Sequence, residues 1–249
     1  MLLLAQLTDT HLFADSQKTM FGCLTNQTFA AVMQEIRQLA PSPDLLLLTG
    51  DISQDETAAS YQYARSLIVP LGIPTYWLPG NHDQNPATIT QLNGDCILGT
   101  KSFVQSGWRF ILLDSAIVGQ PAGCLAVSQL SWLATELQDA RPTLVAIHHH
   151  PIACGLTDMD QIGLTNAHDL FAVLDRYNQV KLVICGHIHQ EFSTQRGHIQ
   201  YFGTPSTCIQ LKPRQATLEL DAQPPGFRLF RLYPDGRFET EVRRLATVP

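Results

Sequence analysis

Five short motifs rich in histidine, aspartate and asparagine punctuate this sequence, and each follows an apolar run that predicts a β-strand. Imidazole nitrogens with carboxylate and amide oxygens bind borderline divalent or trivalent metals, and the motifs lack the thiolates of a structural zinc finger. Singly, each motif is typical of turn chemistry at a strand end. Together they predict a metal centre, and in chain order they are Asp9-Thr10-His11, Gly50-Asp51, Gly80-Asn81-His82-Asp83, His148-His149-His150-Pro151 and Gly186-His187-Ile188-His189.

The residue spacing favours two metal ions. Asp9 and His11 occupy alternate positions on a stretch predicted to be extended, so both side chains point the same way and can reach one ion. His187 and His189 have the same spacing, and the Asp51 carboxylate can bridge two ions. Two divalent ions outweigh the charge of these few carboxylates, and the remaining positive charge suits an anionic phosphate diester.

The apolar runs alternate with helical patterns, which predicts an α/β architecture. In such sheets the ligand crevice lies outside the carboxyl ends of the strands, so strands in one sheet bring the motifs together. A glycine directly before Asp51, Asn81 and His187 lets the backbone turn sharply and approach a ligand closely. The predicted strands are Leu2–Leu7, Leu45–Leu48, Thr75–Leu78, Phe110–Leu113, Leu144–Ile147 and Leu182–Cys185.

Helical periodicity is clearest in the apolar stripe of Phe29, Val32, Met33, Ile36 and Leu39, and further helices are predicted over Ser128–Leu137 and Asn166–Arg176. Ser53 and Glu56 have the spacing of a capping box, which predicts a helix start at Ser53 and explains this serine without a nucleophilic role.

The sequence changes character after about Gly186, where short alternating segments and turn residues take over. Pro234-Asp235-Gly236 separates the alternating runs Phe227–Tyr233 and Arg237–Val242, which predicts a β-hairpin. The sequence contains no internal repeat and no linker-like charge run. We therefore predict one domain over residues 1–249 with a β-rich C-terminal third from about 190 to 249.

Composition excludes several classes of function. The 249 residues are 45% hydrophobic and 15% charged with a net charge of −6, which argues against a nucleic-acid or membrane-surface binder because these need a basic face. The N-terminal apolar run is too short for a signal peptide, and no stretch approaches the length of a membrane span. Six dispersed cysteines without a CxxC pair look like small buried hydrophobes. We expect a cytoplasmic protein.

The ordered set D-x-H, G-D, G-N-H-D, H-H and G-H-x-H resembles the calcineurin-like metallophosphoesterase superfamily. These motifs cover residues from about 5 to 190 and are jointly very specific. Within the superfamily the chain is similar to the bacterial class III cyclic nucleotide phosphodiesterases, the cyclic AMP type especially, over nearly its whole length. The resemblance implies a four-layer α/β/β/α sandwich, in which two mixed sheets pack face to face with helices outside. The closer similarity also rests on residues 50–55, the HHHP run, residues 185–190 and residues 204–208.

The resemblance also implies the roles of the site residues. Asn81 and His82 would be catalytic, with His82 donating to a phosphate oxygen or to the leaving group, and His11, Asn81, His82 and His189 would contact substrate. The expected cofactors are two metal ions, iron and/or manganese, with zinc as an alternative. One ion would be held by Asp9, His11, Asp51 and His189, and the other by Asp51, Asn81, His148 and His187.

The HHHP run leaves a choice of register. The family pattern places the ligand at the first histidine, so we predict His148 and keep His149 as the alternative, with His149 otherwise lying beside the ligands or facing substrate. His150 stands where the superfamily has a proline, and we expect it to be structural. Residues 204–208 either line the substrate pocket or turn a corner, and the sequence does not separate these readings.

The expected function is metal-dependent hydrolysis of a 3′,5′-cyclic nucleotide, cyclic AMP to AMP, by in-line attack of a metal-bridging hydroxide. The closest alternative is a hydrolase of glycerophosphodiesters or other small phosphodiesters. A non-hydrolytic sensor of metal or nucleotide is a third hypothesis, disfavoured because no ligand position is missing. The expected partner is a small cyclic nucleotide, with neither nucleic acid nor membrane involved, and monomer and dimer both remain open.

Overall fold

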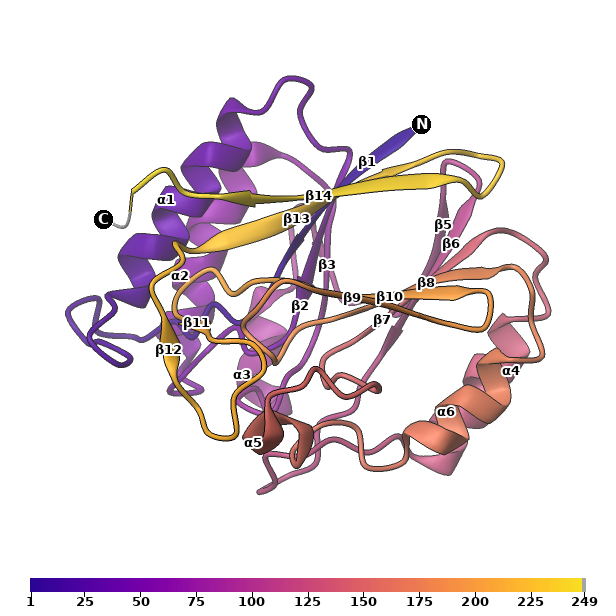
Figure 1. The fold of residues 1–249 in the computed structure, drawn as a ribbon. Coiled ribbons are helices and arrows are strands. Elements are labelled where there is room, and N and C mark those ends of the chain that lie inside the picture. The colour runs from indigo at the N-terminus through magenta and orange to yellow at the C-terminus, as the bar shows by residue number, and fades with distance from the viewer. Residues whose placement is uncertain (248–249) are drawn as a thin grey trace.

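The computed structural model describes residues 1–247, so the last two positions of the predicted domain, 248 and 249, lie outside the described residues. Two six-stranded sheets form the centre of the molecule (Figure 1). The first has the order β14-β13-β1-β2-β3-β4 and consists of β1 (Leu2–Leu7), β2 (Leu45–Thr49), β3 (Thr75–Leu78), β4 (Ile97–Leu98), β13 (Gly226–Leu232) and β14 (Phe238–Arg244). The second has the order β5-β6-β7-β8-β10-β9 and consists of β5 (Ser102–Gln105), β6 (Trp108–Leu113), β7 (Thr143–Ile147), β8 (Val180–Cys185), β9 (Phe192–Arg196) and β10 (Ile199–Gly203).

Both sheets are mixed. Strands β1 to β4 run parallel, and β13 and β14 join them in antiparallel pairings; β6, β7, β8 and β10 run parallel between the antiparallel edge strands β5 and β9. The predicted C-terminal hairpin is present, with Leu232 opposite Phe238. A small separate sheet pairs β11 (Gln210–Leu211) with β12 (Leu220–Asp221).

Helices cover the outer face of each sheet. The first sheet is covered by α1 (Thr25–Gln38) and α2 (Ala58–Ile68), and the second by α4 (Val127–Glu136) and α6 (Ala167–Leu174), as Figure 1 shows. The remaining helices are the short α3 (Pro86–Ile89) and α5 (Thr157–Asp160), with 3₁₀ turns at Val69–Leu71 and Thr90–Leu92. The predicted four-layer α/β/β/α fold is therefore confirmed.

Strand β1 shows how the layers are held together. Leu2 and Leu4 belong to the core between the sheets, where they join residues of the second sheet such as Leu144. Leu3 and Ala5 point the other way and pack in the core that contains the apolar stripe of α1. A strand between two apolar layers must be apolar on both faces, which explains the unbroken apolar runs in the sequence.

The start of α2 corrects one prediction. The helix begins at Ala58 with Thr57 as its N-cap, whose side chain accepts from the N–H of Ser60. Ser53 Oγ does accept the N–H of Glu56, as in a capping box, but Glu56 has φ 52 and cannot continue a right-handed helix. Its carboxylate accepts the N–H of Gln84 instead. The chain therefore first wraps around the loop that follows β3.

Two further sequence expectations have a structural outcome. Within residues 1–247, no helix is both long enough and apolar enough to span a bilayer. All six cysteines are free thiols, with Cys154, Cys185 and Cys208 buried and the other three partly buried.

Candidate metal centre and substrate cavity

The five motifs meet at one edge of the paired sheets, because each follows the carboxyl end of a parallel strand: β1, β2, β3, β7 or β8. Asn81 and His82 are partly exposed. The other predicted ligands are at most 5% exposed, and they are Asp9, His11, Asp51, His148, His187 and His189. Buried polar groups are stable only when they are hydrogen-bonded, paired with an opposite charge or coordinated to a metal ion, so these groups must interact with one another or with a bound ion.

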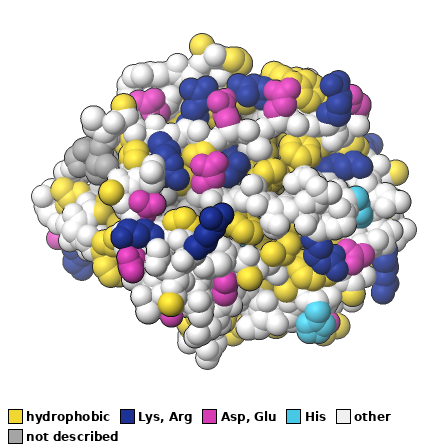
Figure 2. Space-filling view, viewed as in Figure 1, with side chains coloured by type: hydrophobic (Ala, Val, Ile, Leu, Met, Phe, Trp, Pro, Cys, Tyr) yellow, Lys and Arg dark blue, Asp and Glu magenta, His cyan; other side chains and the backbone are white. Residues whose placement is uncertain are grey.

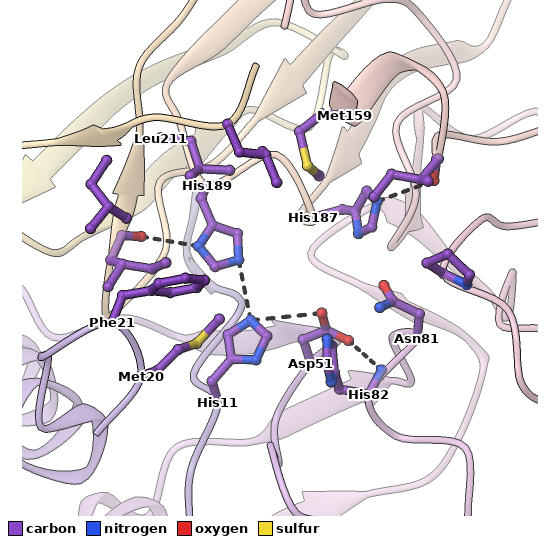
Figure 3. Close-up of a pocket in the computed structure, with 15 residues that line it drawn as sticks. His11, Met20, Phe21, Asp51, Asn81, His82, Met159, His187, His189 and Leu211 are labelled. Carbon is purple, nitrogen blue, oxygen red and sulfur yellow. Dashed lines mark hydrogen bonds and ion pairs between the residues drawn. The ribbon is translucent and has the colours of Figure 1, made fainter. Parts of the chain in front are cut away.

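A first cluster of ligand atoms consists of Asp9 Oδ1, His11 Nε2, Asp51 Oδ2 and His189 Nε2. His189 Nε2 lies 3.3 Å from Asp9 Oδ1 and 3.2 Å from His11 Nε2. His11 Nε2 lies 3.7 Å from Asp51 Oδ2. Figure 3 shows His11, Asp51 and His189 of this cluster pointing toward one another from separate loops.

A second cluster shares the Asp51 carboxylate. His148 Nε2 lies 3.3 Å from Asp51 Oδ2, 3.2 Å from Asn81 Oδ1 and 3.2 Å from His187 Nδ1. Asp51 Oδ2 thus faces both clusters, while Asp51 Oδ1 accepts the backbone N–H of His82 at 2.8 Å. One carboxylate oxygen is fixed by the backbone and the other is free to bridge two ions.

The outer nitrogen of each histidine faces an oxygen that accepts its proton. A ring N–H donated outward leaves a lone pair on the nitrogen that faces the cluster, which is the tautomer a metal ligand needs. The pairs are His11 Nδ1 with Gln54 Oε1 at 2.7 Å, His148 Nδ1 with the Thr49 carbonyl at 2.8 Å, His189 Nδ1 with the Ile209 carbonyl at 3.0 Å, and His187 Nε2 with the Ile162 carbonyl at 3.1 Å.

These observations fit a pair of metal ions. Two ligands bound to one ion at about 2.1 Å stand roughly 3.0–3.4 Å apart, and most distances within the clusters are close to that range. Asp9 and Asp51 have no lysine or arginine partner within the described residues; their ion pairs are with histidines alone. The two buried carboxylates therefore need a counter-charge at this place.

The electrostatics of the site reflect the same need. Burial lowers the pKa of His148, but the Asp51 and Asp9 carboxylates outweigh burial and raise this pKa to about 9. Burial similarly opposes ionisation of Asp51, yet His148 and His11 hold its pKa well below the ordinary value. For His11, burial dominates and lowers the pKa to about 4. The carboxylates are thus ionised and attract positive charge.

The D-x-H and H-x-H stretches are not extended, so that prediction was wrong. Asp9, His11, His187 and His189 all have positive φ, between 46 and 70°, as does Asp51 with φ 51. Residues with side chains adopt this left-handed conformation only at an energetic cost, and such strain is concentrated at functional sites. Asp9 and His11 still reach the same cluster, whereas His187 reaches the second cluster and His189 the first.

The glycines before the ligands serve close approach, as predicted. A Cβ on Gly80 would stand 2.1 Å from Asp51 Oδ1, and one on Gly186 would stand 2.0 Å from Thr8 Oγ1. A Cβ on Gly50, which has φ 95, would meet the His148 ring at 2.4 Å. The ligand loops are therefore packed directly against one another.

Asp83 holds the loop that carries Asn81 and His82. Its buried carboxylate accepts the backbone N–H groups of Ile52, Ser53 and Gly80, with distances of 3.0–3.1 Å. His82 lies beside the two clusters, with its ring edge-on to the His11 ring at a centroid distance of 5.1 Å. Figure 3 shows His82 and Asn81 next to Asp51.

The second and third histidines of the HHHP run have other hydrogen-bond partners. His149 has a ring nitrogen within 4.8 Å of nitrogens of His148 and His187, but its Nδ1 pairs with Ser115 Oγ at 2.7 Å and its Nε2 faces the Pro121 carbonyl at 3.2 Å. His150 Nε2 lies 3.3 Å from Asp160 Oδ1. Of the three, His148 is the one that reaches Asn81 and Asp51.

A cavity of about 250 Å³ opens beside the clusters. One side is polar and consists of His82 with five of the predicted ligands: His11, Asp51, Asn81, His187 and His189. The other side is apolar and comes from segments that we did not predict: Met20, Phe21, Pro121, Met159, Ile162, Ile209, Leu211, Leu218 and Leu220. The segment 204–208 does not line this cavity; Ser206 Oγ instead donates to the Asp9 carbonyl at 2.8 Å, so this segment supports a ligand loop. Sequence reasoning also assigned no role to Gln54 and Thr8, although both contact ligands.

The family model for calcineurin-like phosphoesterases matches residues 2–191. The chain belongs to this family. Similar relatives are a 3′,5′-cyclic-nucleotide phosphodiesterase of Nostoc sp., 44% identical over 97% of this chain and 92% of the relative, and the 3′,5′-cyclic adenosine monophosphate phosphodiesterase CpdA of Escherichia coli, 42% identical over 97% and 89%. Among solved structures, a dimetal phosphatase from Danio rerio shares the fold at a TM-score of 0.74, with 13% identity over 98% of this chain and 96% of that one.

Membership of the calcineurin-like phosphoesterases implies a dinuclear metal centre, and the two clusters around Asp51 supply its donors. The Danio rerio structure supports the fold alone. The relatives span nearly the whole chain, including the β-rich segment after residue 191 that the family model does not cover.

Proposed function

We propose that this calcineurin-like phosphoesterase hydrolyses 3′,5′-cyclic nucleotides, converting cyclic AMP to AMP. The observation that carries the proposal is the Asp51 carboxylate shared between two complete ligand sets, with His82 beside them at a cavity. The names of relatives that are 42–44% identical over 97% of this chain support the cyclic nucleotide as substrate.

The ligands proposed are those predicted from the sequence: Asp9, His11, Asp51 and His189 for one ion, and Asp51, Asn81, His148 and His187 for the other. When bound, the two ions would clamp the phosphate diester and lower the pKa of a water molecule held between them. We propose iron and manganese for the ions, because imidazole and carboxylate donors suit them and supply then decides which metal is taken up.

His82 is the residue proposed to act on the leaving group. Its backbone N–H donates a hydrogen bond to Asp51 Oδ1, which fixes its position relative to the bridging carboxylate. Its partly exposed ring lines the cavity. From there it can protonate the ribose oxygen that leaves phosphorus when the ring opens. Asn81 Oδ1 faces His148 Nε2, so the NH₂ group of the Asn81 side chain is left to donate to a phosphate oxygen.

A small nucleotide fits the molecule better than a polymer. The cavity of about 250 Å³ suits a mononucleotide, and the net charge of −6 opposes binding of nucleic acid or of an anionic membrane surface. We also propose that the chain acts as a single domain in the cytoplasm. Pairing of β1 with both β2 and β13 supports one domain, because it places early and late parts of the chain in one sheet.

The test is hydrolysis by metal-loaded protein. Protein reconstituted with Mn²⁺ or Fe²⁺ is expected to convert cyclic AMP to AMP, and ³¹P NMR measures this conversion. His187→Ala is expected to abolish turnover and to reduce the amount of bound metal. A larger kcat/KM for glycerophosphocholine than for cyclic AMP would favour the glycerophosphodiester alternative. Metal binding without hydrolysis of either substrate would favour a sensor and contradict the proposal.

A further inference from the structure

The apolar side of the cavity exposes hydrophobic side chains that the fold itself does not use. Phe21 is 72% exposed, Leu218 is 51% exposed and Leu220 is 45% exposed. All three line the cavity that five of the predicted metal ligands also line. Exposed apolar groups gathered at the mouth of a cavity indicate a ligand surface.

Phe21 is held in a strained turn. Met20 and Cys23 exchange backbone hydrogen bonds at 2.9 Å, and Phe21 and Gly22 between them have φ 48 and 82, as in a type I′ hairpin turn. Such a turn favours asparagine or glycine at its first central position, and a bulky side chain there is unfavourable. Because the ring stays largely exposed, burial within the chain does not offset this cost.

The position of the ring suggests what it contacts. Figure 3 shows the Phe21 ring projecting into the cavity beside Met20, next to His11 and His189 of the first ligand cluster. A substrate whose phosphate lies at the clusters would extend its other end along this apolar side. None of the described side chains on this side carries a hydroxyl, an amide or a charge, so the side offers stacking and apolar contact rather than hydrogen bonds.

We propose that Phe21 is the stacking platform for the purine base of the cyclic nucleotide, with Leu218 and Leu220 enclosing the base from the β11–β12 segment. The inference rests on the proposed function, because it places the phosphate at the two ligand clusters. A flat, aromatic base is the part of a cyclic nucleotide that gains most from an exposed phenyl ring, and stacking of this kind depends little on the hydrogen-bonding edge of the base.

The test compares two substrates that differ only in the base: cyclic AMP and methyl β-D-ribofuranoside 3′,5′-cyclic phosphate, which carries a methoxy group instead. The measured quantity is the ratio of the kcat/KM values for the two. Phe21→Ala is expected to lower this ratio about tenfold, within the range found when an aromatic stacking partner of a base is removed. Phe21→Trp is expected to keep the ratio near that of the wild-type protein, because the indole ring also stacks.

Val127→Ala is the matched control, since Val127 is 80% exposed on α4 and lies outside the cavity. It is expected to keep the wild-type ratio. An unchanged ratio in Phe21→Ala, with both substrates hydrolysed by the wild-type protein, would overturn the stacking platform and leave the proposed function intact. Failure of the wild-type protein to hydrolyse either substrate would overturn the proposed function first.

Discussion

His148 Nε2 and Asn81 Oδ1 lie 3.2 Å apart although the residues are 67 positions apart in the sequence. The Nδ1 atom of His148 faces the Thr49 carbonyl at 2.8 Å and must donate to it. In its neutral form the ring presents a lone pair on Nε2, which then faces the lone pairs of the amide Oδ1 as a second acceptor. Despite burial, the neighbouring carboxylates raise the pKa of His148 to about 9, so a proton on Nε2 satisfies both atoms, and a bound metal ion would take the place of that proton.

This contact predicts the register of the HHHP run. His148→Ala is expected to lower bound metal from two equivalents to about one, measured by inductively coupled plasma mass spectrometry, because one of the two ions loses a ligand. His149→Ala is the control, since both of its nitrogens are engaged by Ser115 and Pro121, and it is expected to retain two equivalents. The opposite pattern would make His149 the ligand.

The role of His82 predicts a dependence on the leaving group. His82→Ala is expected to keep both metal ions but to lower kcat for cyclic AMP by about 10²–10⁴-fold, the usual contribution of a positioned general acid. A 4-nitrophenyl diester needs no protonation of its leaving oxygen, so the fall in kcat of His82→Ala on this substrate is expected to be much smaller. Equal losses on both substrates would instead assign His82 to phosphate binding.

The ligands could be predicted from the sequence because each lies just after the end of a strand, and the strands can be recognised as apolar runs. The close approaches before Asp51, Asn81 and His187 were readable for the same reason, since only glycine leaves the space. The backbone conformation was not predictable in this way. Asp9 and His11 adopt positive φ while their N–H groups donate to the carbonyls of Gly50 and Asp51, and no local sequence pattern encodes these distant contacts.

The apolar side of the cavity was missed for a different physical reason. Phe21, Met159 and Leu218 come from three segments that meet only in the folded chain, and an isolated apolar residue in a loop is ordinary in any sequence. The Phe21-Gly22 pair does carry a weak turn signal, but the exposure of the ring becomes visible only in three dimensions. The helix start at Ala58 was missed because Asp83 draws the preceding segment into its own hydrogen bonds.

Tight packing of the ligand loops predicts the effect of a single methyl group. Gly186→Ala would place a Cβ 2.0 Å from Thr8 Oγ1 and 2.8 Å from Asp9 Oδ2, so it is expected to destabilise the protein by about 1–3 kcal/mol and to displace Asp9. Gly197→Ala is the control: it has φ 60 but open space, so it is expected to cost about 1 kcal/mol and keep activity. Urea unfolding and turnover measure both. Full activity in Gly186→Ala would show that the loops can separate.

Lys101 predicts a pH dependence of stability. Burial lowers its pKa to about 8 from the ordinary 10.5, although Asp114 opposes this, and its Nζ lies 3.5 Å from the centroid of the Trp77 ring. Between these two pH values the unfolded chain binds the proton and the folded protein does not, so the free energy of unfolding gains a contribution that rises with pH across this window. Lys101→Met is expected to lose this rise, measured by urea unfolding at pH 8 and pH 10. Equal pH dependence in both proteins would contradict the shifted pKa.

The contact between Gln54 and His11 predicts that a residue outside the ligand set controls metal binding. Gln54 Oε1 lies 2.7 Å from His11 Nδ1, so it accepts the outward proton and keeps the His11 Nε2 lone pair directed at the first cluster. Gln54→Leu is expected to weaken binding of one metal ion about 10–100-fold while the other ion stays bound. Gln62→Leu, an exposed position on α2, is the control. Metal titration followed by calorimetry measures both sites, and two unchanged affinities in Gln54→Leu would show that His11 is oriented by its backbone alone.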